Sequence, residues 1–154
     1  MIRRATPEDI KEIDNLLFQV HDVHVKGRPD LFKKGKKKYN DEELKEIIND
    51  NTKPIFVYEF EGKVLGYAFC VITDHSKDES LVDYKNLYID DLCVDQNARG
   101  KGIGKKLYEF VLEFAKSINC YNVTLNVWAK NESAMKFYQS IGMEIQKIGM
   151  EKIL

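Results

Sequence analysis

The sequence contains few cysteines, no long apolar run and no excess of either charge. Its three cysteines, Cys70, Cys93 and Cys120, are an odd number, and none belongs to a C-x-x-C pair. We therefore expect neither a disulfide framework nor a structural zinc site. No apolar run approaches the ~20 residues that a membrane helix needs, and residues 1–7 lack the apolar stretch of a signal peptide. These absences predict a protein of the reducing cytoplasm without a membrane partner.

The charge balance argues against nucleic acid as a partner. Lys and Arg total 24 and Asp and Glu total 25, which gives a formal net charge of -1. Such a chain has no general attraction for a polyanion. The one biased segment, Lys33–Lys38, is predicted to be a solvated loop, with contact to an acidic substrate or protein as the alternative. A length of 154 residues suits one domain, which we assign to residues 1–154.

Hydrophobic periodicity predicts helices in the first third of the chain. Residues 2–5 suit a short strand. The segment Thr6–Asp9 is typical of a helix start, because Thr can cap, Pro suits the first turn and the acids favour the positive end of the helix. Apolar residues then recur at helical spacing up to Val20, and a shorter helix is expected after Asn40.

Strand-like patterns begin at residue 55. Branched and aromatic residues dominate 55–60 and 64–73, which predicts a hairpin around the turn at Gly62. The elements expected next are, in chain order, a strand over 87–94, a helix over 102–119, a strand over 122–128, a helix over 131–140 and a closing strand pair from Met143 around Gly149. This order predicts an α/β (α+β) fold, in which about four helices cover a mixed β-sheet.

A glycine-rich turn, Arg99–Gly104, lies between a predicted strand and a long helix. Glycines let a backbone approach a bulky group, and the helix start supplies free N–H donors, so the turn suits a phosphate or diphosphate. The Walker P-loop pattern fails because Arg99 occupies the place of its first glycine and Lys106 that of its Ser or Thr. The dinucleotide fingerprint needs a third Gly or Ala. Leu107 stands in that place if the pattern starts at Gly102, and Lys105 if it starts at Gly100, so this pattern fails too. A nucleotide-binding protein and a turn without a ligand remain rival interpretations.

The segment Asn131–Met143 provides a second motif. Asn131 suits a helix cap and Gly142 a helix stop. Ala134 and Tyr138 are four residues apart and therefore share a helix face. The small side chain beside the phenol leaves a slot for a thin ligand.

Together these motifs resemble the Gcn5-related N-acetyltransferase (GNAT) superfamily. Residues 88–94 are similar to its central strand, and residues 131–143 match its pattern N-x-x-A-x-x-x-Y-x-x-x-G-F, except that Met143 replaces Phe. Its acetyl-CoA signature, R/Q-x-x-G-x-G/A, is matched at Arg99, Gly102 and Gly104. The three pieces occur in the order and at the spacing of that superfamily, which makes the resemblance far more specific than one glycine motif.

The resemblance implies a mixed sheet splayed at its centre, where two parallel strands, here 87–94 and 122–128, separate. The pantetheine arm of acetyl-CoA would pair with backbone groups of Leu92 and Val94, and the diphosphate would bind N–H groups of the glycine-rich turn. A backbone N–H near Leu92 or Cys93 would polarise the thioester carbonyl. The residues expected to bind this cosubstrate are Leu92, Cys93, Val94, Arg99, Gly100, Lys101, Gly102, Ile103, Gly104, Lys105, Asn131, Ala134 and Tyr138, and no metal is expected.

Tyr138 and Asp90 are the catalytic residues that the resemblance implies. Tyr138 would protonate the departing CoA thiolate; the alternative is a tyrosine that only packs on the sheet. Asp90 would take the proton of the acceptor amine, because some polyamine-acetylating relatives carry Glu there and apolar neighbours would raise the pKa of its carboxyl. A water would relay the proton to this shorter side chain. Asp90 and Asp91 should point to opposite faces unless a bulge intervenes, and the alternative is that both only shape the site.

Several polar residues have no role that the motifs define. His21 and His24 lie one helical turn apart, but no third ligand accompanies them, so packing or solvent roles are favoured over a metal. Either one would also be able to move protons beside the acceptor. Asp22 and Asp30 carry the charge that attracts a cationic amine. Cys93 is expected to pack within its strand and not to act as a nucleophile.

The sequence therefore predicts an enzyme that moves an acetyl group from acetyl-CoA to a primary amine by direct attack in a ternary complex. A small-molecule acceptor such as a polyamine or amino sugar is favoured, because the chain shows no added recognition domain. The alternatives are a protein N-terminus or lysine as acceptor, and a non-catalytic CoA-binding regulatory module. Exposed sheet edges would allow a homodimer, but no residue pattern specifies one.

Overall fold

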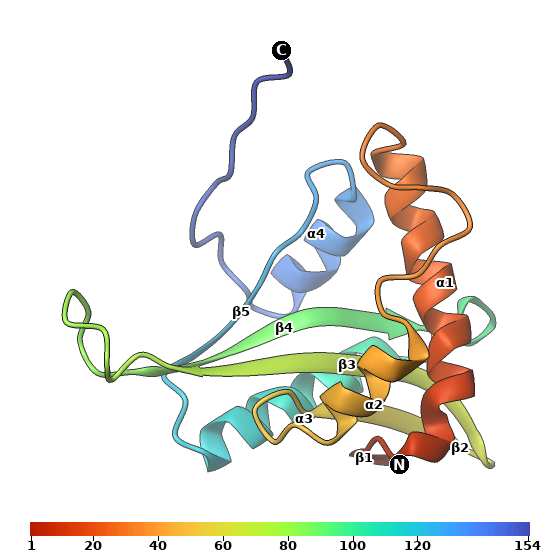
Figure 1. The fold of residues 1–154 in the computed structure, drawn as a ribbon, viewed down its shortest axis with the longest axis horizontal. Coiled ribbons are helices and arrows are strands. Elements are labelled where there is room, and N and C mark those ends of the chain that lie inside the picture. The colour runs from red at the N-terminus through yellow and green to blue at the C-terminus, as the bar shows by residue number, and fades with distance from the viewer.

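Five strands form a single open sheet in the order β1-β2-β3-β4-β5 (Figure 1). The computed structural model describes all residues from 1 to 154. The strands are β1 (Ile2–Arg4), β2 (Ile55–Phe60), β3 (Lys63–Asp74), β4 (Lys85–Val94) and β5 (Asn122–Leu125). Neighbouring strands pair antiparallel, except that β4 and β5 are parallel. The mixed sheet predicted from the sequence is confirmed.

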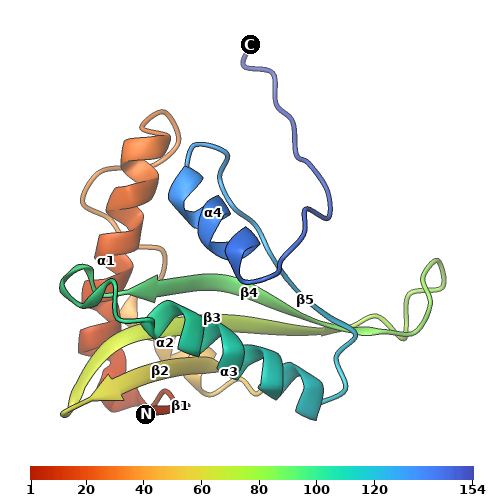
Figure 2. The ribbon, with the colours of Figure 1, turned by 180° about the vertical axis from the view of Figure 1, so that it is seen from behind.

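Helices cover both faces of the sheet. They are α1 (Ile10–Gly27), α2 (Asp41–Ile48), α3 (Ile103–Ser117) and α4 (Glu132–Ser140), and short 3-10 turns at Pro7–Asp9 and Gln96–Ala98 precede α1 and α3. α1 and α2 pack on one face, and α3 packs on the other, which Figure 2 shows from behind. α4 stands above β4 and β5 (Figure 1). The α/β architecture with four helices is therefore confirmed.

The side chains of β3 point alternately to the two faces of the sheet, and each face has its own layer of the hydrophobic core. Tyr67 and Phe69 pack with α1 and α2, whereas Ala68 and Cys70 pack with α3. This period of two is what a strand covered on both faces requires. No helix of the protein is both long and apolar enough to cross a bilayer.

Gly66 of β3 allows α3 to approach the sheet closely. A Cβ at this position would lie 2.9 Å from the carbonyl oxygen of Cys93 and 3.0 Å from Cδ1 of Leu107 in α3. Both distances are shorter than van der Waals contact, and one of the two atoms belongs to the backbone. Packing therefore requires a glycine here.

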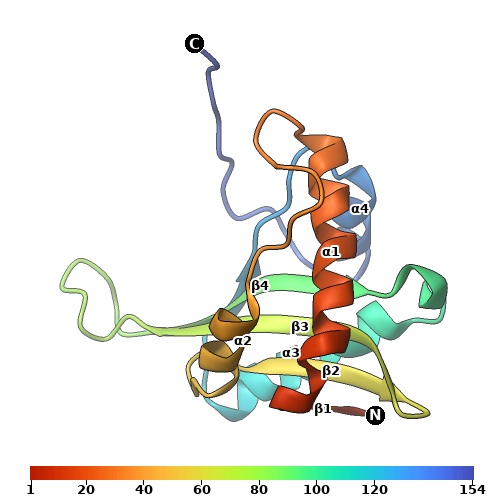
Figure 3. The same cartoon turned by 45° about the vertical axis from the view of Figure 1, so that its right-hand side comes forward.

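The closing strand pair predicted from Met143 around Gly149 is wrong. Residues 143–154 form neither helix nor strand and run away from the sheet (Figure 3). Alternating apolar residues predict extended backbone, but a strand also needs a partner, and the outer edge of β5 does not pair with this segment. β5 itself ends at Leu125 and not at residue 128, because its pairing with β4 stops there.

Gly66→Ala should destabilise the protein, because the added methyl group would overlap the Cys93 carbonyl and Leu107. We expect a loss of about 1–3 kcal/mol in the free energy of unfolding, measured by urea denaturation. Gly27→Ala is the matched control, since a Cβ there would meet no atom within 4 Å. Equal stability of the two variants would contradict this role for Gly66.

Candidate active site

The parallel pairing of β4 and β5 is short. It begins at Asn86 and stops at Ile89, which lies opposite Leu125, whereas β4 continues beside β3 to Val94. β5 leads towards α4, so the two segments diverge beyond this point (Figure 2). Backbone groups on the β5 side of residues 90–94 therefore have no strand partner. The predicted splay of the sheet is confirmed, and it leaves an opening between β4 and α4.

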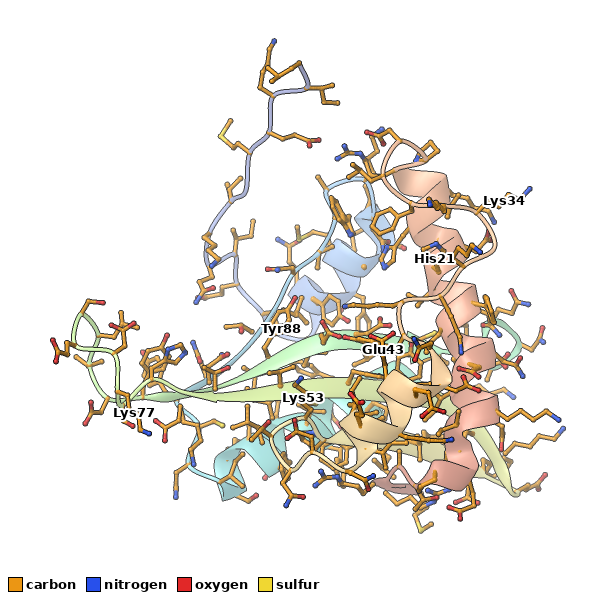
Figure 4. All side chains as sticks on the ribbon, viewed as in Figure 1. His21, Lys34, Glu43, Lys53, Lys77 and Tyr88 are labelled. Atoms are coloured by element: carbon orange, nitrogen blue, oxygen red, sulfur yellow. The ribbon has the colours of Figure 1, made fainter.

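Side chains connect the two strands along the paired stretch that precedes the opening. The amide of Asn86 donates hydrogen bonds to Asn122 at 2.9 Å and to Thr124 at 3.0 Å. Asn126 donates to the hydroxyl of Tyr88 at 3.2 Å, and Figure 4 shows Tyr88 on the sheet below α4. These bonds hold β5 to β4 up to the point of separation.

A β-bulge in β4 brings two neighbouring carboxylates to one face of the sheet. The register with β3 shifts beyond Asp91, which lies opposite Phe69, and this shift leaves Asp90 as the extra residue. Asp91 therefore shares the face of Phe69, on which α1 and α2 pack. Asp90 reaches the same face, because it accepts a hydrogen bond from Tyr39, whose ring stacks on Phe69. The bulge that the sequence analysis left open is present.

Both oxygens of the Asp90 carboxylate have polar partners. Lys38 donates to one oxygen at 2.8 Å and the hydroxyl of Tyr39 to the other at 2.6 Å, and the Asp90 side chain is only 15% exposed. The expected apolar surroundings of Asp90 are therefore wrong, because the α1–α2 connection brings an ammonium and a phenol to it. Burial and this hydrogen bond raise the pKa of Tyr39, so its hydroxyl stays protonated and donates.

The lysine-rich connection between α1 and α2 is exposed, as predicted for Lys33–Lys38, except at Lys37. Lys37 forms ion pairs with Asp14 of α1 and, at 2.7 Å, with Asp41 of α2, and its side chain is 17% exposed. A ring nitrogen of His21 lies 2.6 Å from the carbonyl oxygen of Lys33, and Figure 4 shows His21 on α1 beside this loop. Local composition cannot identify these acids, because they come from other elements.

Asp91 is the second carboxylate on this face. Burial raises its pKa to about 6, and a hydrogen bond from Tyr67 opposes the shift. The Tyr67 hydroxyl donates to Asp91 at 2.6 Å, and Tyr67 itself is fully buried. Sequence analysis named Asp91 only as a residue that shapes the site, because its partner Tyr67 lies on the neighbouring strand.

The glycine-rich turn forms an open cradle at the start of α3. Gly100 and Gly102 have φ angles of 82° and 76°, which favour glycine, and a Cβ on either would meet no atom within 4 Å. α3 begins at Ile103 with neither a side-chain cap nor an acid in its first turn. Its first N–H groups and the positive end of its dipole therefore lack an opposing group within the chain. This arrangement fits a diphosphate.

The cradle meets the end of β4 and α4. A Cβ on Gly104 would lie 3.4 Å from Cζ of Phe137 in α4 and 3.6 Å from Cγ2 of Val94 in β4. The cations around the turn are all exposed: Arg99, Lys101 and Lys105. The fold thus brings together the three segments that carry the sequence motifs.

α4 places Tyr138 beside the end of β4. Asn131 caps the helix as predicted, because its side-chain oxygen accepts from the N–H of Ala134 at 3.2 Å. Burial raises the pKa of Tyr138, and the nearby Asp91 and Cys93 raise it further, so the phenol keeps its proton at neutral pH. The Tyr138 hydroxyl makes no hydrogen bond within the protein. Every buried side-chain nitrogen or oxygen atom does have a hydrogen-bond partner, so this hydroxyl is not buried and is accessible to a ligand or to water.

Cys93 packs its thiol into the core. The residue is 5% exposed, its sulfur lies 3.6 Å from the carbonyl oxygen of Leu16 in α1, and burial raises its pKa to about 12. A thiol in this state is a poor nucleophile. Any role of Cys93 in binding would use its backbone.

The end of α1 and the β5–α4 connection enclose a hollow of about 490 Å³. His24 stacks on Phe32 with 5.2 Å between ring centroids, and Phe32 packs edge-on against Trp128 at 5.6 Å. The Arg28 guanidinium lies 5.8 Å from the Trp128 ring. His24 thus has a packing role. Sequence analysis missed Trp128 as a site residue, because the strand pattern predicted it to be the last residue of a strand.

The remaining candidates are paired within the chain. Asp22 forms an ion pair with Lys26 at 3.0 Å, and Asp30 with Arg28 at 2.8 Å. Neither carboxylate is therefore free for an amine. No group of three or more His, Cys, Asp or Glu side chains is placed to hold a metal ion.

A splayed parallel strand pair, a glycine cradle at a helix start and a tyrosine on the last helix define an acyltransferase-like architecture. A family model described as "Acetyltransferase (GNAT) family" matches residues 18–143. The chain therefore belongs to the GNAT acetyltransferase family.

Relatives of this chain are N-acetyltransferases. It is 40% identical to glucosamine 6-phosphate N-acetyltransferase of Arabidopsis thaliana over 65 residues, which cover 42% of either chain. It is 30% identical to N-alpha-acetyltransferase 50 of Danio rerio over 92% of this chain and 72% of that protein. The matches to the first three curated relatives span only 42%, 62% and 65% of their own lengths.

Among solved structures, the tetramutant of the BH1408 protein from Bacillus halodurans is similar over 100% of this chain and 99% of its own. The TM-score is 0.94 and the sequence identity 32%. The match extends the likeness to the whole chain, including the residues outside 18–143.

The contribution of Asp91 to the free energy of unfolding should be less favourable above pH 6 than below pH 4. Its folded-state pKa of about 6 lies above the ordinary 3.8, so the stability that the protonated form contributes is lost as the pH rises through about 6. Asp91→Asn should therefore gain about 1–2 kcal/mol over wild type at pH 7.5 and little at pH 4, as measured by urea denaturation. Asp83→Asn, at an exposed position, is the control. An equal gain at both pH values would refute the shift.

Proposed function

We propose that this protein is an acetyl-CoA-dependent N-acetyltransferase that acts on a primary amine. The observation that carries this proposal is the opening beyond Ile89, with the glycine cradle at one end and Tyr138 at its side. Acetyl-CoA supplies an acetyl group activated as a thioester. The protein binds this cosubstrate, holds the acceptor for direct attack and moves protons at two places.

Backbone groups supply most of the binding. The free edge of β4 at Leu92 and Val94 pairs with the pantetheine arm as an added strand would. The diphosphate rests on the N–H groups of residues 99–104 and the start of α3, with the exposed cations around it. Asn131 and Ala134 at the start of α4 line the opposite wall. A backbone N–H at Leu92 or Cys93 stabilises the charge that develops on the carbonyl oxygen.

Tyr138 donates a proton to the sulfur of the leaving thiolate. Its raised pKa keeps it protonated, and its hydroxyl has no partner in the protein that would have to be displaced. At the other side of the reacting carbon, Asp90 and Asp91 share one face of β4. Asp90 binds the acceptor ammonium in place of Lys38. Asp91, whose pKa is about 6, is basic enough to accept the proton of the amine, directly or through a water.

The acceptor is proposed to be a small molecule with a primary amine. The ammonium of Lys38 on Asp90 is the group that an amino sugar or polyamine presents, and one relative is named for glucosamine 6-phosphate. A protein N-terminus is the second candidate, because the relative matched over 92% of this chain is an N-alpha-acetyltransferase.

Turnover with a panel of amines tests the proposal. The protein is mixed with acetyl-CoA and spermidine, glucosamine 6-phosphate or a peptide with a free N-terminus, and released thiol is measured. Turnover with either small amine supports the proposal, and turnover with the peptide alone favours the second candidate. Tight binding of acetyl-CoA with no turnover on any amine would instead indicate a regulatory module.

Tyr138→Phe should lower kcat about 100-fold, because general acid catalysis contributes about 10²–10⁴ in rate. The affinity for acetyl-CoA should change little, since the ring is kept. Steady-state kinetics and calorimetry measure the two quantities. Tyr121→Phe, at an 80% exposed position, is the control, and undiminished kcat in Tyr138→Phe would remove Tyr138 as the acid.

Gly102→Glu should abolish acetyl-CoA binding, because it places bulk and negative charge in the cradle. Gly62→Glu is a matched control, since Gly62 has the same φ of 76° and a Cβ there also meets no atom within 4 Å. Both variants place the same side chain at the same positive φ, so a difference in calorimetric affinity reports the cradle. Retained affinity in Gly102→Glu would show that the diphosphate binds elsewhere.

Asp90→Asn and Lys38→Met should change the KM for the amine in opposite directions. The first removes the charge that binds the acceptor ammonium, and the second removes the internal ammonium that competes for it. We expect about a tenfold rise and a severalfold fall, which correspond to charge-assisted bonds of about 1–2 kcal/mol. Lys36→Met, at an exposed position of the same loop, should leave KM unchanged. A fall in kcat of Asp90→Asn without a rise in KM would instead make Asp90 the base.

A further inference from the structure

The hollow between the end of α1 and the β5–α4 connection has no part in the transfer chemistry described above. Its volume of about 490 Å³ falls within the range of ~300–1,000 Å³ that is usual for small-molecule pockets. Figures 1 and 3 show the end of α1 beside α4, above the sheet. The hollow is therefore large enough to hold one part of an acceptor.

The α1–α2 connection joins this hollow to Asp90. Lys38 donates to Asp90 at 2.8 Å. His24 lines the hollow, and its pKa is lowered by burial and by the charges of His21 and Lys38, so Lys38 lies close to His24 as well. Phe32 of the same connection stacks on His24. One wall therefore runs from the carboxylate at the bulge to the hollow.

β4 and the end of β5 provide the opposite wall. Tyr88 precedes Asp90 by two residues in β4, and Figure 4 shows it below α4. Its hydroxyl accepts from Asn126 at 3.2 Å, and Trp128, two residues further along the chain, lines the hollow. A ligand with its amine at Asp90 therefore extends between the two walls towards the hollow.

Arg28 is the best-enclosed cation of the hollow, because its side chain is only 13% exposed and lies 5.8 Å from the Trp128 ring. Its Nε and Nη2 donate to the two oxygens of Asp30 at 3.0 and 2.8 Å, so a near neighbour occupies one edge of the guanidinium. Its Nη1 donates to Glu151 at 2.6 Å. Packing and Asp30 thus hold the guanidinium in place, whatever occupies Nη1.

Lys130 adds a second cation beside Arg28. It forms no ion pair of its own. The hydrogen bond from Arg28 lowers the pKa of Asp30, and the charge of Lys130 lowers it further, so the three groups lie together. Two cations therefore face one near carboxylate, which leaves one positive charge for Glu151 to balance.

The other charged groups of the hollow are matched locally. Lys26 forms an ion pair with Asp22 at 3.0 Å. Glu132 lies in the first turn of α4, where the positive end of the helix dipole stabilises an acid. The charge that the hollow presents to a ligand is therefore that of Arg28 and Lys130.

Glu151 is a displaceable partner of Arg28. Its side chain is 56% exposed, and it belongs to residues 143–154, which form neither helix nor strand. An exposed carboxylate gains little from such an ion pair, so the anion of a ligand can replace it. Glu151 on Arg28 thus corresponds to Lys38 on Asp90, where an internal ammonium occupies the place proposed for the amine.

We propose that the hollow binds an anionic group of the acceptor, a carboxylate or a phosphate, which replaces Glu151 on Arg28 while the amine of the same molecule lies at Asp90. The inference rests on the proposed function and narrows its substrate class to amines that also carry an anion. The guanidinium donors of Arg28 suit the oxygens of either anion, and Lys130 adds its charge. A polyamine offers no anion and would bring a further ammonium towards these two cations.

The fluorescence of Trp128 tests the anion site without turnover, because this residue is the single tryptophan of the chain. Glucosamine 6-phosphate and 4-aminobutyrate serve as the phosphate and carboxylate probes. Glucosamine and butylamine are their counterparts without the anion. We expect a saturable change in emission with at least one anionic probe, and a Kd about tenfold higher or more for its counterpart. No preference for the anion in either pair, including no saturable change with any probe, would overturn the proposal.

Arg28→Met and Glu151→Gln should shift this Kd in opposite directions. The first removes the guanidinium and should raise the Kd of the anionic probe about tenfold or more. The second removes the competing charge and should lower it severalfold. Glu144→Gln and Lys11→Met, at exposed positions that do not line the hollow, are the matched controls and should leave it within about twofold.

Lys130→Met is a second test, because Arg28 also packs on Trp128 and its loss could disturb the fold. Lys130 is exposed, so this variant should fold normally and should raise the Kd of the anionic probe severalfold. Circular dichroism checks the fold of both variants. An unchanged Kd in Lys130→Met, or in a folded Arg28→Met, would contradict the anion site.

Thiol release with the same two pairs of amines separates this inference from the proposed function. A higher kcat/KM for the anionic member of a pair supports both. Equal kcat/KM within both pairs would leave the acetyltransferase function standing and refute the anion site. Anion-dependent fluorescence without turnover on any amine would support the anion site and count against the proposed function.

Discussion

The early end of the β4–β5 pairing is the constraint on which the site depends. Beyond Ile89, β4 keeps β3 on one side and loses β5 on the other, so the strand stays rigid while one row of backbone groups is free. If β5 continued beside β4 to Val94, those groups would be used within the sheet and α4 would have no place beside them. Because β4 then leads directly into the glycine cradle, a ligand that pairs with the free edge reaches the start of α3 next.

The bulge at Asp90 creates an electrostatic conflict that the fold resolves in two ways. Two adjacent carboxylates on one face repel each other, and regular alternation would have separated them. Asp90 is neutralised by Lys38 and Tyr39. Asp91 is buried with Tyr67 and holds its proton up to a pKa of about 6, in part because of Asp90. As a result, two aspartates in sequence differ in chemistry: Asp90 is suited to binding a cation, and Asp91 is suited to taking up a proton.

The sequence predicts the fold better than the surroundings of the site. Local patterns identify the helices, the hairpin and the glycine turn, because capping, periodicity and turn chemistry act over a few residues. The cradle follows from a motif of the same short range, and the splay is implied by the resemblance to the GNAT superfamily. The partners of Asp90 and Asp91 do not, since Lys38 and Tyr67 come from segments more than twenty residues away. Residues 143–154 were misassigned for a related reason: their partial alternation suits an extended backbone, but no strand of the sheet pairs with them.

Glycine is required in this protein for two different physical reasons, lack of space and backbone conformation. Gly66 excludes a side chain because Cys93 and Leu107 occupy the space, so its role is complete within the folded chain. Gly100 and Gly102 face no atom at all, and backbone conformation alone explains why they are glycines. The open N–H groups at the start of α3 suit the diphosphate that we propose to bind there. The acceptor has no comparable backbone signature. We propose that side chains of the α1–α2 connection recognise it, because the ammonium of Lys38 already occupies Asp90 there.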